Sequence, residues 1–183
     1  ELWKQTEWPD LQVYFTSVTD HWSTATITGP NARKVLAKVC DDLDLSADSF
    51  QFMDWREGTV AGAKARVFRI SFTGELSYEI NVPAHYGRHV WEALMEAGEE
   101  FDITAYGTES MHVLRAEKGF IIVGQDTDGS MTPADMNMDW VVNKNKAFSF
   151  IGKRSLERSD SVRENRKQLV GLKTLDGAEV IPE

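Results

Sequence analysis

Two carboxylates lie close together beside a predicted turn, and their residue types and spacing could form a ligand site. Apolar and polar residues alternate over 68–72 and again over 76–82, which is the period typical of half-buried strands. Gly74 lies between the two runs and gives a tight connection the backbone freedom that it needs. The alternation puts Glu75 and Glu79 on one face of this predicted hairpin. They are either solvated charge, the usual state of glutamate, or part of a ligand site.

Other residues with catalytic or metal-binding chemistry are present, but their spacing forms no site. His85 and His89 would share one helix face, yet no clear third ligand accompanies them. Asp126 and Asp128, followed by Gly129, begin like a calcium loop, but the later ligands of an EF-hand are missing. We therefore expect no metal site. No serine or cysteine stands in a nucleophile elbow, and no glycine-rich loop suits a dinucleotide.

Composition limits the classes of partner. The chain has 183 residues, 42% of them hydrophobic and 27% charged, as in an ordinary globular protein. A net charge of −9 argues against nucleic acid, because phosphate binding requires clustered lysine and arginine. The basic-leaning residues 163–167 include Glu164 and read as a solvated surface. No apolar run approaches the ~20 residues that a membrane span needs, so we expect no membrane contact.

The cysteine count and the first residues bear on location. Cys40 is the single cysteine and ends an apolar helical stripe, so we expect a core position rather than a nucleophile. One cysteine cannot form an internal disulfide, which fits the reducing cytoplasm. The chain opens on Glu1 with no signal-peptide pattern and no initiator methionine. We therefore expect a piece of a longer cytoplasmic polypeptide.

The elements that precede the two carboxylates are two strands and a helix. Residues 13–18 and 22–28 are rich in threonine and aromatic residues, and they predict paired strands with a turn at 19–21. Pro30 fits the first turn of a helix, in which apolar residues recur at helical spacing as far as Val39. Residues 55–59 read as a loop.

Two further helices follow the hairpin. Apolar residues at helical spacing predict a helix from Tyr86 to Ala97, with Gly98 as its C-cap. A second helix begins with Thr108 as its N-cap and ends cleanly at Gly119.

The last third of the chain predicts less regular structure. Residues 120–123 read as a short strand, 125–131 as a loop, and 155–167 as a helix plus linker. Residues 168–175 alternate again and predict the first strand of another domain. The fold class is therefore α+β, with antiparallel hairpins, packed helices and the start of a C-terminal β domain. The predicted domains are 1–160 and 161–183.

Five motifs in order resemble a known family. They are Gly29-Pro30-Asn31-Ala32, Thr73-Gly74-Glu75-x-x-Tyr78-Glu79-Ile80, Leu114-Arg115-Ala116-Glu117-Lys118-Gly119, Gly124-Gln125-Asp126 with Thr132-Pro133, and Phe150-Ile151-Gly152-Lys153. Together they resemble the folate-binding aminomethyltransferases, the family of the glycine cleavage T protein. The opening motifs, Gln5-Thr6-Glu7-Trp8-Pro9-Asp10-Leu11 and Val18-Thr19-Asp20-His21-Trp22, resemble the C-terminal part of the alpha subunits of heterotetrameric sarcosine oxidases.

The resemblance implies a partial aminomethyltransferase folate-binding fold and a set of folate-binding residues. The family places its pterin-holding carboxylate at the position of Glu79. A carboxylate suits this role because it can accept two parallel hydrogen bonds from the donor edge of a reduced pterin. Phe72 stands where the family often has tyrosine, so packing against folate remains but a hydroxyl contact is lost. Glu75 is expected to hold the turn, and Arg115 either contacts folate, pairs with Glu79 or Glu117, or is a surface arginine. The catalytic aspartate of the family falls upstream of this chain, so no catalytic residue is assigned.

The resemblance also implies a reaction and partners. Sarcosine would be oxidised at a flavin and its one-carbon unit passed to tetrahydrofolate, which gives glycine, hydrogen peroxide and 5,10-methylenetetrahydrofolate. FAD, FMN and NAD would lie outside this chain, and the beta, gamma and delta subunits would be its partners. The motifs also fit a glycine cleavage T protein or a dimethylglycine-type oxidase or dehydrogenase. A non-catalytic folate-binding or docking module is the alternative from another class.

Overall fold

The chain divides into two compact units, Glu1–Phe120 and Ile121–Glu183, in the computed structural model, which describes residues 1–175 and 177. The first unit contains a sheet and its helices, and the second contains short helical turns. The domain division expected at residues 160/161 stays a prediction.

A four-stranded antiparallel sheet forms the centre of the first unit. Its strands are β1 (Trp22–Thr28), β2 (Trp55–Val60), β3 (Ala63–Phe68) and β4 (Ser77–Pro83), in the order β1-β4-β3-β2. Ala61 and Gly62 both have positive φ and form the tight turn between β2 and β3. β4 is therefore central, with β1 on one side and β3 on the other.

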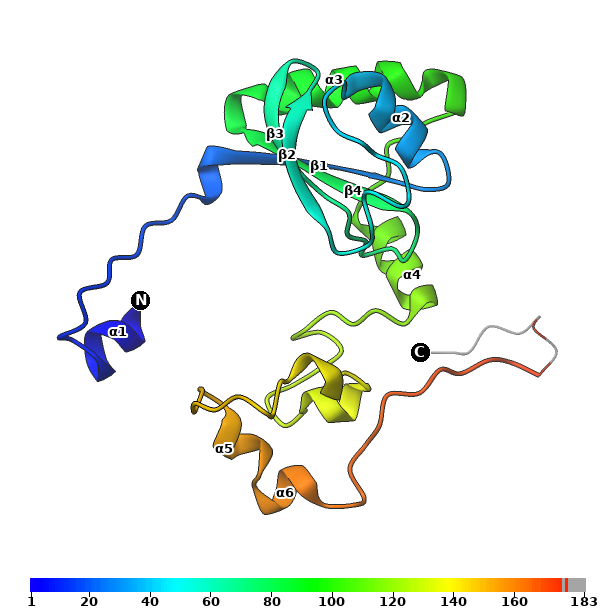
Figure 1. Ribbon diagram of the computed structural model, residues 1–183. Helices are drawn as coiled ribbons and strands as arrows, with labels where there is room; N and C mark the ends of the chain where they lie inside the picture. The colour runs from blue at the N-terminus through cyan, green and yellow to red at the C-terminus, as the bar shows by residue number, and fades with distance from the viewer. Residues whose placement is uncertain (176, 178–183) are drawn as a thin grey trace. The chain divides into compact units, whose positions relative to one another are not determined.

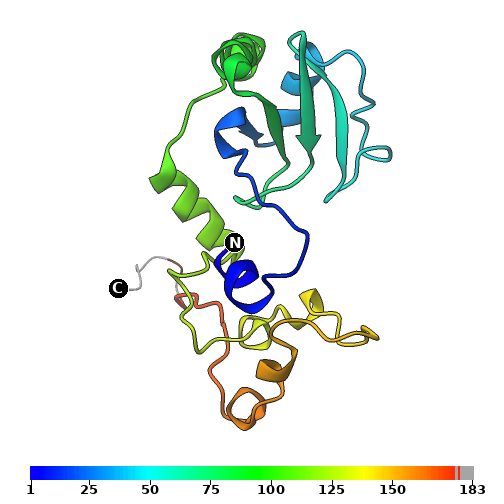
Figure 2. The ribbon, with the colours of Figure 1, turned by 90° about the vertical axis from the view of Figure 1, so that its left-hand side faces the viewer.

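Two helices cover one face of this sheet, α2 (Ala32–Val39) and α3 (Gly87–Gly98) (Figure 1; Figure 2 turns the view by 90°). Alternate residues of β4 point into this layer, and Tyr78, Ile80 and Val82 are buried there. Cys40 is also buried in this core, as predicted. The shorter helices of the unit are α1 (Leu2–Glu7), η1 (Thr19–His21), η2 (Ala84–Tyr86) and η3 (Glu99–Phe101).

Two strand assignments in the first half of the chain were wrong. Residues 13–18 form no strand and lie exposed, although β1 forms as predicted. Residues 55–59, predicted as a loop, belong to β2. The pattern of β2 is weak because it is an edge strand interrupted by Gly58, where a Cβ would lie 2.6 Å from Leu43 Cγ.

The predicted hairpin forms with a longer connection than expected. β3 ends at Phe68 and β4 begins at Ser77, so residues 69–76 all belong to the connecting loop. α3 ends within one residue of the prediction, but Gly98 is its last helical residue and Glu99 is the C-cap. Gly98 is right-handed, with φ −90°, and a glycine is needed there because Ile103 packs against it. α4 (Thr108–Lys118) also forms, with Gly107 rather than Thr108 at its N-cap and with Gly119 left-handed at its end.

The described residues of the second unit form four short helical segments. They are η4 (Pro133–Met136), η5 (Asp139–Val141), α5 (Lys153–Leu156) and α6 (Ser159–Val162). Residues 120–123 and 168–175 were predicted as strands, but they adopt no regular secondary structure. The start of a C-terminal β domain is therefore not confirmed, and the rest of that prediction falls on residues 176 and 178–183, outside the described part of the chain.

Candidate functional site

Glu79 lies on the central strand β4, on the face of the sheet opposite α2 and α3. Its direct neighbours across the ladder are Thr26 of β1 and Phe68 of β3. Directly opposed residues of antiparallel strands share a face, so these three side chains stand side by side. Glu79 is half-buried, and this burial raises the pKa of its carboxyl group above its ordinary value.

An aromatic pair adjoins this carboxylate. Trp55 of β2 is opposite Phe68, and their rings stack with centroids 6.0 Å apart and planes 22° apart. A carboxylate beside a flat aromatic surface can bind a planar heterocycle, because it accepts hydrogen bonds from the edge while the rings contact the face. Neither aromatic residue was predicted as part of the site: Trp55 fell in a predicted loop, and the position of Phe68 beside Glu79 depends on the register between β3 and β4. The sequence carried little signal for β2, since only Trp55 and Val60 of this strand are apolar.

Glu75 lies in the loop before β4, where it contacts the end of β1. The Thr28 hydroxyl donates to Glu75 Oε2 over 3.5 Å, and the Thr28 and Thr73 hydroxyls are 3.0 Å apart. Tyr106 is also coupled to this carboxylate: burial, followed by the negative charge of Glu75, raises the pKa of the Tyr106 phenol. The role predicted for Glu75, holding the turn, agrees with these contacts but stays a prediction.

The loop and the end of α4 meet at Gly74, which brings two of the sequence motifs together. Gly74 has φ +86°, and a Cβ there would lie 2.3 Å from Lys118 Cγ. Arg115, one turn earlier in α4, is 8% exposed and donates from Nη1 to the carbonyl of Phe120 over 3.0 Å. This burial excludes a surface role for Arg115, whereas its pairing with Glu79 or Glu117 stays a prediction. Phe72 is 36% exposed.

Replacing Gly74 with alanine is expected to destabilise the first unit. Gly62 is the matched control, because it also has positive φ but a Cβ there meets nothing within 4 Å. Left-handed strain alone predicts a loss of about 1–2 kcal/mol for Gly62→Ala. Gly74→Ala should cost about 1–3 kcal/mol more, since the methyl group would overlap the base of the Lys118 side chain. Urea unfolding measures both, and equal losses would contradict the close contact.

The raised pKa of Glu79 predicts a pH dependence of stability. The folded chain holds the Glu79 proton more tightly than the unfolded chain. The stability that this group contributes is therefore present at low pH and is lost as pH rises through the folded pKa. Glu79→Gln should flatten this decline and stabilise the ligand-free chain at neutral pH. Urea midpoints between about pH 4 and 8 test this, and an unchanged slope would contradict it.

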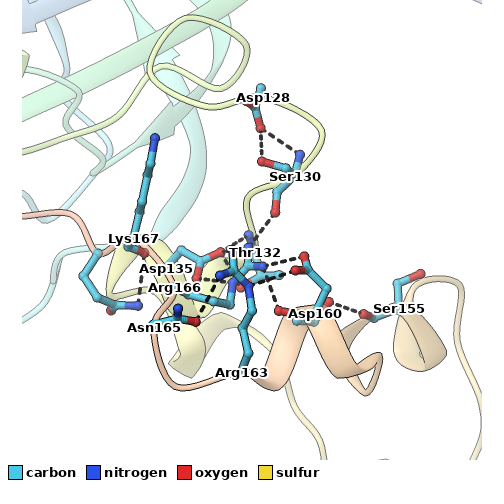
Figure 3. A network of polar contacts seen from close by, with 12 residues as sticks. Asp128, Ser130, Thr132, Asp135, Ser155, Asp160, Arg163, Asn165, Arg166 and Lys167 are labelled. Carbon is cyan, nitrogen blue, oxygen red and sulfur yellow. Dashed lines mark hydrogen bonds and ion pairs between the residues drawn. The ribbon is translucent and has the colours of Figure 1, made fainter.

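The second unit contains a buried ion pair that the sequence analysis missed (Figure 3). Arg166 donates from Nε to Asp135 Oδ1 over 2.7 Å and from Nη2 to Asp135 Oδ2 over 2.5 Å. The backbone N–H and hydroxyl of Thr132 also donate to Asp135 Oδ2, over 2.7 and 3.0 Å. The Arg166 guanidinium holds the pKa of this buried carboxyl well below its usual range. The pair thus fixes residues 163–167 to the start of η4.

The other residues of 163–167 are exposed, as predicted, but the reading as solvated surface is wrong for Arg166, whose side chain is only 8% exposed. The hydrogen bonds from Thr132 to Asp135 could have been predicted from the sequence, whereas the pairing with Arg166 could not. Thr132 and Asp135 are three residues apart with Pro133 between them, which is the pattern of a capped helical turn. The chain beyond Arg166 is held as well, since Leu169 N donates to the Asp135 carbonyl over 2.8 Å.

Residues 1–175 and 177 contain neither a cluster of metal-ligating side chains nor a helix that could cross a membrane. No three or more histidine, cysteine, aspartate or glutamate side chains gather there as ligands for a metal ion. The helices in that part of the chain are all too short or too polar to span a bilayer.

The chain matches one family model and is similar to several known proteins. The family model described as "GCVT N-terminal domain" matches residues 2–146. The sarcosine oxidase subunit alpha of Corynebacterium sp. (strain U-96) is 55% identical over 97% of this chain, which spans 18% of that subunit. An aminomethyltransferase of Halothermothrix orenii is 37% identical over 84% of this chain and 42% of its own length. The mitochondrial dimethylglycine dehydrogenase of Homo sapiens is 34% identical over 91% of this chain and 19% of its own length.

These matches confirm the resemblance that the ordered motifs predicted. They also show that this chain spans less than a fifth of the sarcosine oxidase subunit to which it is similar.

Proposed function

Because this chain belongs to the GCVT N-terminal domain family, we propose that it is the tetrahydrofolate-binding part of a sarcosine oxidase alpha subunit. The observation that carries this proposal is the half-buried Glu79 beside the stacked pair of Phe68 and Trp55. A reduced pterin has a donor-rich edge and a flat face, and this arrangement offers a partner for each.

Each site residue has a proposed role. Glu79 accepts hydrogen bonds from the pterin edge, while Phe68 and Trp55 contact the ring system. Phe72 packs near the folate, Glu75 holds the loop, and Arg115 contacts the folate or keeps Glu79 ionised, since a nearby cation favours the charged carboxylate.

The reaction of the whole protein is also a proposal. Sarcosine is oxidised at a flavin held outside this chain, and tetrahydrofolate accepts the one-carbon unit as 5,10-methylenetetrahydrofolate, with glycine and hydrogen peroxide as the other products. The catalytic aspartate lies upstream, FAD, FMN and NAD are held elsewhere in the enzyme, and the beta, gamma and delta subunits are its partners in the cytoplasm. The relative named as a sarcosine oxidase subunit supports this assignment.

Two other functions remain as alternatives. An aminomethyltransferase or a dimethylglycine dehydrogenase would use the same site, but the relatives with these names are 37% and 34% identical, against 55% for the sarcosine oxidase subunit. A docking module without folate affinity is the alternative from another class.

Titration with tetrahydrofolate separates these classes. We expect saturable binding, detected by calorimetry and by a change in tryptophan fluorescence. Trp55→Phe should remove most of the fluorescence change, because Trp55 adjoins Glu79 through Phe68. Trp91→Phe is the control on α3, across the sheet. The absence of saturable binding would favour the docking module.

A further inference from the structure

β1 has a free edge that borders an apolar cleft. The strand is at the end of the sheet order and, among the described residues, pairs only with β4. A cleft of about 690 Å³ adjoins it, and Ala25 and Ile27 of β1 form part of its wall. The other apolar groups in the wall include Trp91, Leu94, Met95, Phe101 and Ile103. Free strand edges bind further strands readily, and native proteins usually cover them.

A segment suited to this edge precedes it directly. Residues 11–18 carry no charged side chain and include Leu11, Val13, Tyr14 and Phe15, which are 52%, 44%, 90% and 56% exposed. The segment has the alternation of a strand, yet it lies outside the sheet. Only the short turn η1 separates it from β1.

The side chains of this segment match β1 in register. With η1 as the connection, Val18 lies opposite Trp22, and the antiparallel ladder then places Phe15 opposite Ala25 and Val13 opposite Ile27. Ala25 and Ile27 face the cleft, so both apolar side chains would enter it.

The polar side of the same segment matches as well. In this register Tyr14 lies opposite Thr26 and Thr16 opposite Thr24, and both of these β1 threonines are exposed. A shift by one residue would turn the apolar side chains to solvent, so the match is specific.

We propose that residues 11–18 add to β1 as an antiparallel fifth strand, and that Val13 and Phe15 close the cleft. The same chain is the expected donor, because a connection as short as η1 brings the two strands together at little entropic cost. Tyr14 then stands on the Glu79 face, with Thr26 between them.

Paired cysteines test this register in the full chain, with Cys40→Ser as background. Tyr14→Cys with Thr26→Cys and Phe15→Cys with Ala25→Cys are consecutive opposed pairs, so one of them is the close, non-hydrogen-bonded type. Tyr14→Cys with Ala25→Cys is the control, since these residues face opposite sides. We expect at least one opposed pair to form an intrachain disulfide at least tenfold faster than the control. Equal rates would overturn the proposal, and so would disulfides formed only between two copies.

Hydrogen exchange gives a second measurement that does not depend on cysteines. Phe15→Asp places a charge in the cleft and should release the strand, whereas Tyr14→Asp places it on the solvent side. We expect the β1 amides that point to the free edge, rather than toward β4, to exchange at least tenfold faster in Phe15→Asp than in Tyr14→Asp. Similar exchange in the two variants would overturn the proposal.

Discussion

Glu79→Gln is expected to weaken tetrahydrofolate binding by about 1–3 kcal/mol, or roughly 5- to 150-fold, the cost of a lost charge-assisted hydrogen bond. Glutamine keeps the size of the side chain but replaces one acceptor oxygen with an N–H₂ donor, which meets another donor on the pterin edge. Calorimetric titration at neutral pH measures the change.

Glu57→Gln is the matched control for this loss. Glu57 is on β2 of the same sheet, but its side chain is 64% exposed and pairs with Arg66 over 3.2 Å. Its replacement should leave the affinity unchanged. If Glu79→Gln bound tetrahydrofolate as tightly as Glu57→Gln does, Glu79 would not be the pterin partner.

The same substitution should have opposite effects on stability and on binding. Burial without ligand disfavours the Glu79 carboxylate, which is the reason for its raised pKa. If Glu79 is a binding residue that the protein keeps at some cost in stability, Glu79→Gln should be more stable than the native chain but bind tetrahydrofolate more weakly. A residue with only a structural role would lose stability instead.

Local sequence patterns predicted the elements whose signals are local. α2 and α3 follow from apolar residues at helical spacing. α4 follows from its end signals, and Gly119 marks its end because it takes the left-handed conformation there. The face of Glu79 follows from simple alternation along β4. The failures concern pairing: residues 13–18 have the pattern of a strand but no neighbour, and β2 has a neighbour but a weak pattern.

In the candidate site, too, local patterns could be predicted and the pairing between strands could not. Glu79 could be placed on its face from alternation, but its aromatic neighbours depend on the register between β2, β3 and β4, which is a non-local property. Arg166 was misread for a related reason. Arginine is mostly exposed, and its burial depends on Asp135, 31 residues earlier in the chain.

Arg166→Met is expected to destabilise the second unit by about 3–5 kcal/mol, because it leaves the Asp135 carboxylate buried without its cation. Hydrogen exchange of residues 128–137 and 160–169 measures the loss. Arg163→Met is the matched control: Arg163 pairs with Asp160 over 2.8 Å, but both side chains are exposed. This exposed pair should contribute no more than about 1 kcal/mol.

The pH dependence of stability in the native chain and in Arg166→Met distinguishes the loss of the ion pair from a general loss of packing. In the native chain the folded pKa of Asp135 is depressed, so its stabilisation is complete above the unfolded pKa and is lost as pH falls toward the folded pKa. Without Arg166 the depression of that pKa shrinks, because burial then opposes only the two Thr132 hydrogen bonds, so the variant should lose less stability through this group as pH falls. Adding Asp135→Asn to Arg166→Met should restore part of the loss at neutral pH. A double variant no more stable than Arg166→Met would show that packing of the arginine side chain, rather than its charge, holds residues 163–167 in place.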